Sequence, residues 1–278
     1  MVDLLGGSEI RALAEELGVS PTKKLGQNFV TDPNTIRRIV AAAKLKGTEV
    51  VVEIGPGLGS LTLGLLEQAK TVIAVEIDRK MAEAIESTVV KRAQGKDFRL
   101  ITADAMKVNQ LPLAPDALVA NLPYNISVPV LLHFLETFPS ISSGLVLVQA
   151  EVAHRLAATP GSKVYGVPSA KLAWYADSNL AGNVGRSIFW PIPNVDSALV
   201  YFTKRITPLG DEALRLKTFA VIDEAFSQRR KTLRQALANW AGTPAKAEEY
   251  LVAAGIDPSQ RGEQLTVTEF VSIAKQAN

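Results

Sequence analysis

The sequence has 278 residues, of which 47% are hydrophobic and 21% are charged, and its formal net charge is +2. This length allows about two globular domains, and the composition excludes an intrinsically disordered chain. Because the chain has no cysteine and two histidines, it excludes disulfides, iron–sulfur clusters, cysteine-ligated zinc and thiol catalysis, and we expect no metal site.

The first 46 residues carry charges of opposite sign in succession. Residues 1–19 have a net negative charge and no apolar core, which is unlike a secretory signal or an organelle transit peptide. Residues 20–46 have a net positive charge. No uncharged apolar stretch reaches the length of about 18 residues that a transmembrane helix needs, so we expect a cytoplasmic protein without a membrane partner.

Between residues 49 and 149 the sequence alternates strand and helix patterns. Short apolar runs rich in β-branched residues predict strands, and 3.6-residue spacing predicts helices. Strands are predicted over 49–54, 71–77, 99–102, 117–120 and 145–149, and helices over 61–68, 79–94 and 128–136. Strands that alternate with helices indicate an α/β fold, with a parallel sheet covered on both faces.

The pattern changes after the Trp-Pro-Ile-Pro run at residues 190–193. One more strand is predicted over 198–204, and from residue 211 onward glycine and proline separate purely helical segments. These helices are predicted over 211–227, 228–241, 244–254 and 266–277. We therefore expect two domains, an α/β domain over 1–207 and a small all-helical domain over 208–278.

A glycine-rich loop, Glu53-Ile54-Gly55-Pro56-Gly57-Leu58-Gly59, follows the first predicted strand. Glycines let a backbone turn sharply and approach a ligand without a Cβ in the way. The dinucleotide-binding fingerprint would require a glycine at position 60, where this chain has Ser60. The loop alone is weak evidence, because a purely structural tight turn has the same pattern.

Acidic residues at the ends of the next two strands sharpen the interpretation. Glu76 comes 21 residues after Gly55, where a carboxylate can accept hydrogen bonds from both hydroxyls of a ribose. Asp104 ends the third strand, where it can accept a hydrogen bond from an adenine amino group. Polar groups at adjacent strand ends form one crevice at the carboxyl edge of a parallel sheet. This pattern resembles the S-adenosylmethionine (SAM) site of class I methyltransferases more than an NAD site.

The sequence Asn121-Leu122-Pro123-Tyr124 follows the fourth strand. The Asn121 side-chain oxygen and the Pro123 carbonyl could each accept one N–H of an exocyclic adenine amine, so that the nitrogen lone pair points at a methyl donor. The Tyr124 ring could stack on a base taken out of its helix. Positioning of this kind needs no strong base, which suits a chain poor in histidine.

With these residues the chain resembles the small-subunit ribosomal RNA adenine dimethyltransferase family (KsgA/RsmA type), from about residue 22 to 265. Each matching piece could occur by chance, but all of them in this order are specific to the family. The pieces are Leu25-Gly26-Gln27-Asn28-Phe29, Glu53–Gly59, Asn121–Tyr124, Glu151–Leu156, Pro160-Gly161-Ser162-Lys163, Tyr165-Gly166, Phe189-x-Pro191-x-Pro193-x-Val195-x-Ser197 and Phe226–Arg234.

The resemblance implies a class I SAM-dependent methyltransferase with a Rossmann-like, mostly parallel seven-stranded sheet. Its implied activity is dimethylation of the exocyclic amino group of two adjacent adenosines near the 3′ end of small-subunit rRNA, late in subunit assembly. Residues 1–207 would then bind SAM and catalyse transfer, and residues 208–278 would recognise RNA. The implied partners are the small ribosomal subunit and its rRNA, and the protein would be a monomer.

The resemblance also assigns roles to individual residues. Those implied to bind SAM are Asn28, Val30, Gly55, Gly57, Glu76, Ile77, Asp104, Ala105 and Asn121. Those implied to act on the adenine are Asn121, Pro123, Tyr124 and Phe189, with Phe189 facing Tyr124 across the target base. The sequence departs from the family pattern at Val30, where leucine is commoner, and at Val167-Pro168, where Arg-Leu is usual.

Four cations within six residues, Arg229, Arg230, Lys231 and Arg234, are the predicted rRNA phosphate contacts. On a continuous helix, Arg229 and Arg230 would flank an apolar stripe. The stripe would consist of Ile222, Phe226, Leu233, Leu237 and Trp240. A helix face that lays arginine stems over the core, with their charged ends in water, is the alternative interpretation.

Two alternative functions stay open from the sequence. The first is a macrolide-resistance methyltransferase acting on large-subunit rRNA, which shares the Gln-Asn-Phe and Asn-x-Pro-Tyr pieces. The second is a non-catalytic ribosome-assembly or transcription factor on the same fold. The Arg-Arg-Lys-Thr-Leu-Arg run favours the small-subunit enzymes, and the intact glycine loop and Asn121–Tyr124 favour an active enzyme.

Overall fold

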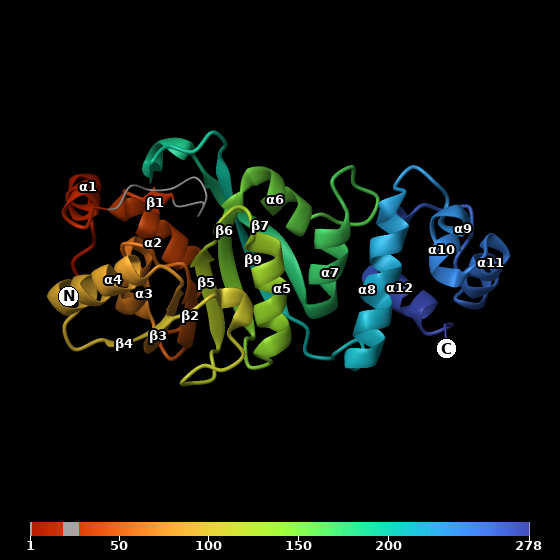
Figure 1. The fold of residues 1–278 in the computed structure, drawn as a ribbon, viewed down its shortest axis with the longest axis horizontal. Coiled ribbons are helices and arrows are strands. Elements are labelled where there is room, and N and C mark those ends of the chain that lie inside the picture. Colours follow the sequence, from red (N-terminus) through yellow and green to blue (C-terminus); the bar gives the residue numbers. More distant parts are fainter. Residues whose placement is uncertain (1, 19–27, 278) are drawn as a thin grey trace. The chain divides into compact units, whose positions relative to one another are not determined.

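The computed structural model describes residues 2–18 and 28–277, and strands alternate with helices through its N-terminal half (Figure 1). The strands are β1 Phe29–Val30, β2 Val50–Ile54, β3 Thr71–Glu76, β4 Asp97–Thr102, β5 Ala117–Asn121, β6 Ser143–Gln149, β7 Ala176–Val184, β8 Phe189–Trp190 and β9 Ser197–Lys204. The helices are α1 Gly7–Glu16, α2 Pro33–Ala42, α3 Ser60–Gln68, α4 Arg79–Arg92, α5 Ser127–Thr137, α6 Ala150–Leu156, α7 Val167–Tyr175, α8 Glu212–Ser227, α9 Leu233–Ala236, α10 Ala238–Ala241, α11 Pro244–Ala253 and α12 Val267–Ala274.

Seven strands form one sheet in the order β4-β3-β2-β5-β6-β9-β7. Strands β2 to β6 pair in parallel, and β9 runs antiparallel to β6. Every residue of β3 is buried, because a central parallel strand is covered on both faces. The predicted mostly parallel sheet is confirmed. Strand β7 escaped prediction because its Ala-Asp-Ser-Asn-Leu-Ala-Gly-Asn-Val sequence, suited to the edge of a sheet, has no apolar run.

A second, two-stranded sheet joins segments far apart in the sequence. In this sheet β1 pairs antiparallel with β8, so that Phe29 lies opposite Trp190 and Val30 opposite Phe189. The stacked rings of Phe29 and Trp190 have centroids 6.2 Å apart. The sequence did not predict this pairing, because two-residue strands carry no periodicity.

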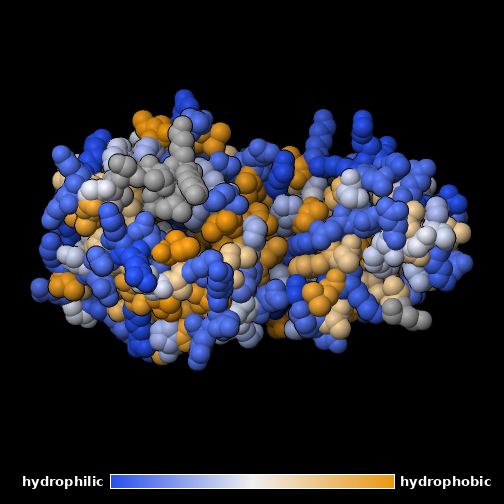
Figure 2. Space-filling model, viewed as in Figure 1, coloured by the Kyte–Doolittle hydropathy of each residue, from blue (hydrophilic) through white to orange (hydrophobic). Residues whose placement is uncertain are grey.

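The described chain divides into two compact units, Met1–Ala153 with Leu180–Thr203, and His154–Asn179 with Lys204–Asn278. The second unit thus includes residues 154–179 as well as the C-terminal helices expected over 208–278. The reason is packing, since Tyr165 and Ala170 are buried in one core with Ile222, Leu251 and Phe270. Hydrophilic residues cover much of the visible surface over the C-terminal helices, with single apolar residues between them (Figure 2).

The Val167-Pro168 departure from the family pattern falls at the start of α7. Proline is suited to the first turn of a helix, where its missing N–H has no partner to lose. Val167 packs against the core of the second unit. The valine that stands where the family usually has arginine therefore contributes apolar contact there.

The predicted helix over 228–241 is wrong. Helix α8 ends at Ser227, residues 228–232 are not helical, and α9 and α10 follow as two short helices. The backbone N–H groups of Leu233 and Arg234 donate to the carbonyls of Gln260 and Pro258 instead of to a preceding helical turn. Ile222, Leu233 and Leu237 still share one core, so the apolar residues were identified correctly although the continuous helix was not.

Candidate active site

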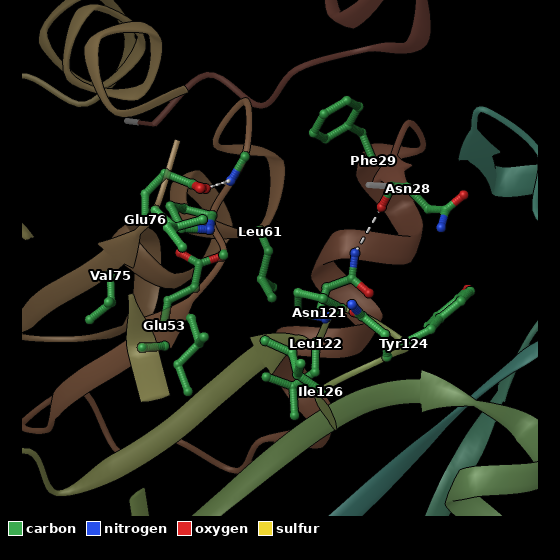
Figure 3. Close-up of a pocket in the computed structure, with 18 of the residues that line it drawn as sticks. Asn28, Phe29, Glu53, Leu61, Val75, Glu76, Asn121, Leu122, Tyr124 and Ile126 are labelled. Carbon is green, nitrogen blue, oxygen red and sulfur yellow. Dashed lines mark hydrogen bonds between the residues drawn. The ribbon is translucent and has the colours of Figure 1, made fainter. Parts of the chain in front are cut away.

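A cavity of about 330 Å³ opens where β2, β3 and β5 end (Figure 3). Such a crevice at the carboxyl ends of parallel strands is the usual ligand site of an open α/β sheet. Of the residues that the sequence analysis selected, the cavity is lined by Asn28, Val30, Gly55, Gly57, Glu76, Ile77, Asp104, Ala105, Asn121, Pro123 and Tyr124. Three residues of the first matching piece, Leu25, Gly26 and Gln27, lie outside the described residues.

The glycine loop approaches β1 so closely that it requires glycine at position 57. Gly57 has a φ of +56°, and a Cβ built on it would lie 2.6 Å from Cε1 of Phe29. Any L-residue here would be strained by its backbone and would collide with the ring. Glycine at position 57 is therefore required by the packing of the loop against β1.

Glu76 ends β3 and is 5% exposed. Its two carboxylate oxygens accept backbone hydrogen bonds from Gly57 at 3.2 Å and from Asp78 at 3.0 Å. Burial raises the pKa of Glu76, and these backbone bonds oppose that shift. The backbone N–H of Ile77 also stabilises the carboxylate, and the acceptor capacity that these backbone bonds leave can serve a ligand hydroxyl.

Asn121 ends β5, and its side-chain amide has a fixed orientation. The Nδ2 group donates to the backbone carbonyl of Asn28 at 2.9 Å, drawn as a dashed line in Figure 3. A carbonyl can only accept, so the NH₂ side of the amide is identified and the Oδ1 atom is the acceptor left at the cavity. Residue Asn28, 93 positions earlier, thereby sets the direction of the hydrogen-bond acceptor at the strand end.

Tyr124 lines the cavity as a half-buried ring whose outer end is held. Its Oη lies 2.9 Å from Oγ of Ser197, the buried first residue of β9. Burial raises the pKa of the Tyr124 hydroxyl. Phe189 does not line the cavity; it is 2% exposed and lies opposite Val30 in the β1–β8 pair. Its contact with a target base stays a prediction.

Two buried polar residues of the cavity wall were missed as site residues by the sequence analysis. Glu53 on β2 is 1% exposed, and its Oε2 accepts a 2.6 Å hydrogen bond from Oγ1 of Thr62. Ser60 is 6% exposed, and its Oγ is buried without a hydrogen-bond partner among the described residues. Glu53 could have been identified from the sequence, because it is a charged residue inside an otherwise apolar strand. For Ser60 the sequence offered no sign except its position directly after the glycine loop.

Burial raises the pKa of Glu53 to about 8, against an ordinary value of 4.5. The folded chain therefore holds this proton at pH values where the unfolded chain has lost it, so its free energy of unfolding falls as the pH rises from 4.5 towards 8. Glu53→Gln keeps an acceptor oxygen for Thr62 and removes the titration. As the pH rises from 4.5 towards 8, we expect the melting temperature of the wild type to fall relative to that of the variant. Above this pH range the difference between the two melting temperatures should stay constant. If the melting temperatures of the wild type and the variant differed by the same amount at every pH, this would contradict a buried carboxyl that keeps its proton.

The four predicted phosphate contacts lie in the second unit and differ in their surroundings. Arg229 pairs with Glu263 at 3.0 Å and donates to the carbonyl of Lys163 at 2.6 Å. Arg234 pairs with Glu248 at 2.6 Å. Arg230 and Lys231 are exposed, and their side chains make no hydrogen bond or ion pair with another described residue. The non-helical segment 228–232 thus presents two cations to solvent.

Within residues 2–18 and 28–277, no cluster of histidine, aspartate and glutamate could hold a metal ion. In the same residues no helix combines the length and apolarity needed to span a membrane.

Comparisons with known proteins identify relatives along nearly the whole chain. A family model described as ribosomal RNA adenine dimethylase matches residues 19–278. A curated protein of Arthrobacter sp. (strain FB24), named ribosomal RNA small subunit methyltransferase A, is 60% identical over 98% of this chain and 92% of its own length. A protein of the same name from Streptomyces coelicolor is also 60% identical, over 98% of this chain and 96% of its own length.

Two crystal structures share the fold. A dimethyladenosine transferase from Plasmodium falciparum superposes with a TM-score of 0.75 at 25% identity, covering 88% of this chain and 95% of that one. The 23S rRNA methyltransferase ErmE superposes with a TM-score of 0.65 at 24% identity, covering 89% of this chain and 98% of that one. The methyltransferase fold expected from the sequence is confirmed.

Proposed function

The chain belongs to the ribosomal RNA adenine dimethylase family, and on that premise we propose that it transfers methyl groups from SAM to small-subunit rRNA. The reaction dimethylates the exocyclic amino groups of two adjacent adenosines near the 3′ end of the RNA. Curated relatives at 60% identity bear the name of a small-subunit enzyme, which supports this substrate over large-subunit rRNA. The similarity to ErmE, at 24% identity, concerns the fold alone.

The observation that carries the proposal is the orientation of Asn121. Its amide NH₂ is occupied by the carbonyl of Asn28, and its oxygen is left as an acceptor at the cavity beside Pro123 and Tyr124. An exocyclic amine that donates to this oxygen and to the Pro123 carbonyl has both of its hydrogens held. Its lone pair is then directed away from them, which is the orientation that a nucleophile requires.

The cavity suits an adenosyl ligand. The Glu76 carboxylate, held by backbone N–H groups at the cavity, can accept a hydrogen bond from a ribose hydroxyl, and Asp104 at the neighbouring strand end offers a carboxylate to an adenine amino group. The buried hydroxyl of Ser60, in the cavity wall, is left for a polar partner. When bound, SAM supplies a methyl group activated by its positive sulfonium.

The residues around the transfer point act by holding the base. The Tyr124 ring offers a flat face, and stacking on such a face contributes about 1–3 kcal/mol per base. Because Ser197 holds its hydroxyl, the ring is restrained before any substrate binds. On accepting a methyl group the amine becomes a cation that readily loses one proton to water, so no strong general base is required, and no histidine lines the cavity. The chemistry is carried by position and by hydrogen-bond acceptors.

We propose that the second unit binds rRNA phosphates through the cations of segment 228–232. Arg230 and Lys231 fit this role better than Arg229 and Arg234, which already face carboxylates. The partner is the small ribosomal subunit late in its assembly, and the setting is the cytoplasm, with the protein acting as a monomer.

Replacing Arg230 and Lys231 together with glutamine is expected to weaken binding to unmethylated small subunits and to flatten its salt dependence. The slope of log affinity against log salt should fall by about 0.7–0.9 for each lost phosphate contact. Melting temperature and SAM affinity should be unchanged, because neither side chain contacts another described residue through a hydrogen bond or ion pair.

The matched control is the Arg229→Gln/Arg234→Gln pair, which removes the same charge from two nearby positions, one in segment 228–232 and one in α9. Because these arginines are ion-paired, we expect a smaller change in the salt slope, together with a modest loss of stability, about 0–1 kcal/mol for each exposed pair. If the slope of log affinity against log salt were the same for the wild type and the Arg230/Lys231 variant, segment 228–232 would not contact RNA phosphates.

Incubation with radiolabelled SAM and unmethylated subunits tests the function directly. Purified small subunits and large subunits are offered separately, and the labelled nucleotides are mapped. We expect two methyls on each of two adjacent adenosines of small-subunit rRNA. Label on large subunits alone would support the macrolide-resistance type, and tight subunit binding without label would support a non-catalytic assembly factor.

A further inference from the structure

The N-terminal segment, residues 2–17, comes before the part of the chain that the family model matches, and none of its residues lines the cavity. We propose that this segment, bound by Arg92, holds β1 in place at the cavity, which makes Arg92 a positioning residue for SAM binding and methyl transfer. The ligand and the reaction rest on the proposed function, whereas the support of β1 rests on the contacts described below.

The N-terminal segment is part of the hydrophobic core of the first unit. Leu5, Ile10 and Ala14 are 0–1% exposed. They belong to the same buried cluster as Phe29 and Val30 of β1. Ile10 and Ala14 stand four residues apart and so share one face of α1. Because burial of apolar side chains is favourable, this face docks the segment in the core that also contains β1.

Arg92, the last residue of α4, binds the segment through its side chain and its backbone. Its guanidinium pairs with Asp3 at 2.8 Å and with Glu9 at 2.5 Å. Its backbone carbonyl accepts a hydrogen bond from the N–H of Asp3 at 3.2 Å. The other oxygen of Glu9 accepts from the N–H of Gly6 at 2.7 Å, so one carboxylate both caps α1 and binds Arg92. The start of α1 is therefore joined to the end of α4.

The start of α1 also lies against the residue that follows β1. A Cβ built on Gly7 would lie 3.4 Å from Cβ of Thr31, which is van der Waals contact. Thr31 is bound as well to the residue before β8, because its N–H and its Oγ1 both donate to the carbonyl of Ile188 at 2.8 Å. The end of β1 therefore contacts both α1 and the segment that leads into β8.

A displacement of β1 would change the cavity directly. Asn28, which precedes β1, lines the cavity together with Val30, and its carbonyl orients the Asn121 amide at 2.9 Å. Phe29 packs against Gly57 of the glycine loop. Strand β1 has two residues and lies in a two-stranded sheet, which is marginally stable by itself. The position of β1 therefore depends on contacts outside its own sheet, among them the contact with α1.

Hydrogen exchange of the full chain without ligand measures the support of β1. Arg92→Glu replaces attraction to Asp3 and Glu9 by repulsion. The amide of Thr31, which is bonded to the segment before β8, should then exchange about three- to thirtyfold faster. Amides of the central strand β3 should keep their wild-type protection. Arg92→Lys retains the charge, so its Thr31 exchange should fall between those of the wild type and Arg92→Glu.

Calorimetry with SAM and single-turnover transfer to unmethylated small subunits measure the consequence. In Arg92→Glu, SAM affinity and the transfer rate at saturating SAM should each fall about three- to tenfold, because β1 is in place in a smaller fraction of molecules. Arg99→Glu is the matched control. It makes the same change of charge and breaks the exposed pair with Asp97 on β4. Thr31 exchange, SAM affinity and transfer rate should stay at wild-type values in this control.

The possible results separate positioning from a purely structural role. Faster Thr31 exchange with unchanged SAM affinity and transfer rate would restrict Arg92 to the stability of the fold and overturn the inference. Unchanged Thr31 exchange, equal losses in Arg99→Glu, or Arg92→Lys behaving like Arg92→Glu would overturn it as well. If the wild type neither bound SAM nor transferred methyl groups, the proposed function would fail, while the exchange of Thr31 would still test the support of β1.

Discussion

Replacing Asn121 with alanine is expected to slow methyl transfer by about 100-fold or more while leaving the fold and most of the SAM affinity intact. The variant loses the oxygen that holds the target amine, and the loss of one oriented hydrogen bond at a reacting centre has an effect of this size. It also loses the bond to the carbonyl of Asn28, which orients that oxygen. Single-turnover rates on unmethylated small subunits, with SAM binding measured by calorimetry, provide the test.

Asn121→Asp is the informative companion variant. It retains an acceptor oxygen but cannot donate to the Asn28 carbonyl, so the oxygen is no longer held in place and a negative charge faces a carbonyl. We expect its rate to fall nearly as far as that of the alanine variant. Near wild-type dimethylation by either variant would show that Asn121 does not position the amine.

Replacing Glu76 with alanine is expected to weaken SAM binding far more than it changes RNA binding. Loss of a charged acceptor for the ribose hydroxyls corresponds to about 1.5–3 kcal/mol, or roughly 10- to 150-fold in affinity. The structure adds a second contribution, because the N–H groups of Gly57 and Asp78 lose their acceptor and the glycine loop loses its brace. The total effect should therefore exceed that of the ribose contacts alone.

Glu76→Gln is a milder change that weakens both contributions, since it is nearly isosteric but offers one acceptor oxygen in place of two. We expect its SAM affinity to fall between those of the wild type and of Glu76→Ala. Calorimetry with SAM measures the cofactor, and subunit binding without SAM measures RNA. An unchanged SAM dissociation constant in the alanine variant would place the cofactor elsewhere.

The sequence was sufficient to identify the cavity because its residues stand at fixed points of a repeating pattern. Strands β2, β3 and β5 are apolar runs, and parallel strands all end at the same edge of the sheet. Finding Gly55, Glu76 and Asn121 at three strand ends therefore predicted that they would meet. The structure confirms that they line one cavity. Their roles in binding and transfer remain predictions that the variants above test.

Other features were decided by contacts that no local pattern encodes. The direction of the Asn121 amide depends on Asn28, and the hold on Tyr124 depends on Ser197, 73 residues later. Helix 228–241 was predicted from periodicity, yet residues 258–260 accept hydrogen bonds from Leu233 and Arg234 and interrupt it. A partner distant in sequence outweighed local helix propensity in that segment.

The sequence by itself thus determined the parallel strands of the sheet, the glycine loop and the residue types at the strand ends, because these follow from 2- and 3.6-residue periodicity and from the geometry of parallel strands. Tertiary structure decided which cations are free, which carboxyl keeps its proton and which hydroxyl lacks a partner. Arg230, Glu53 and Ser60 differ from other residues of their types through burial and through neighbours that folding brings near. Such properties depend on distance in space, to which the order of residues along the chain gives no direct guide.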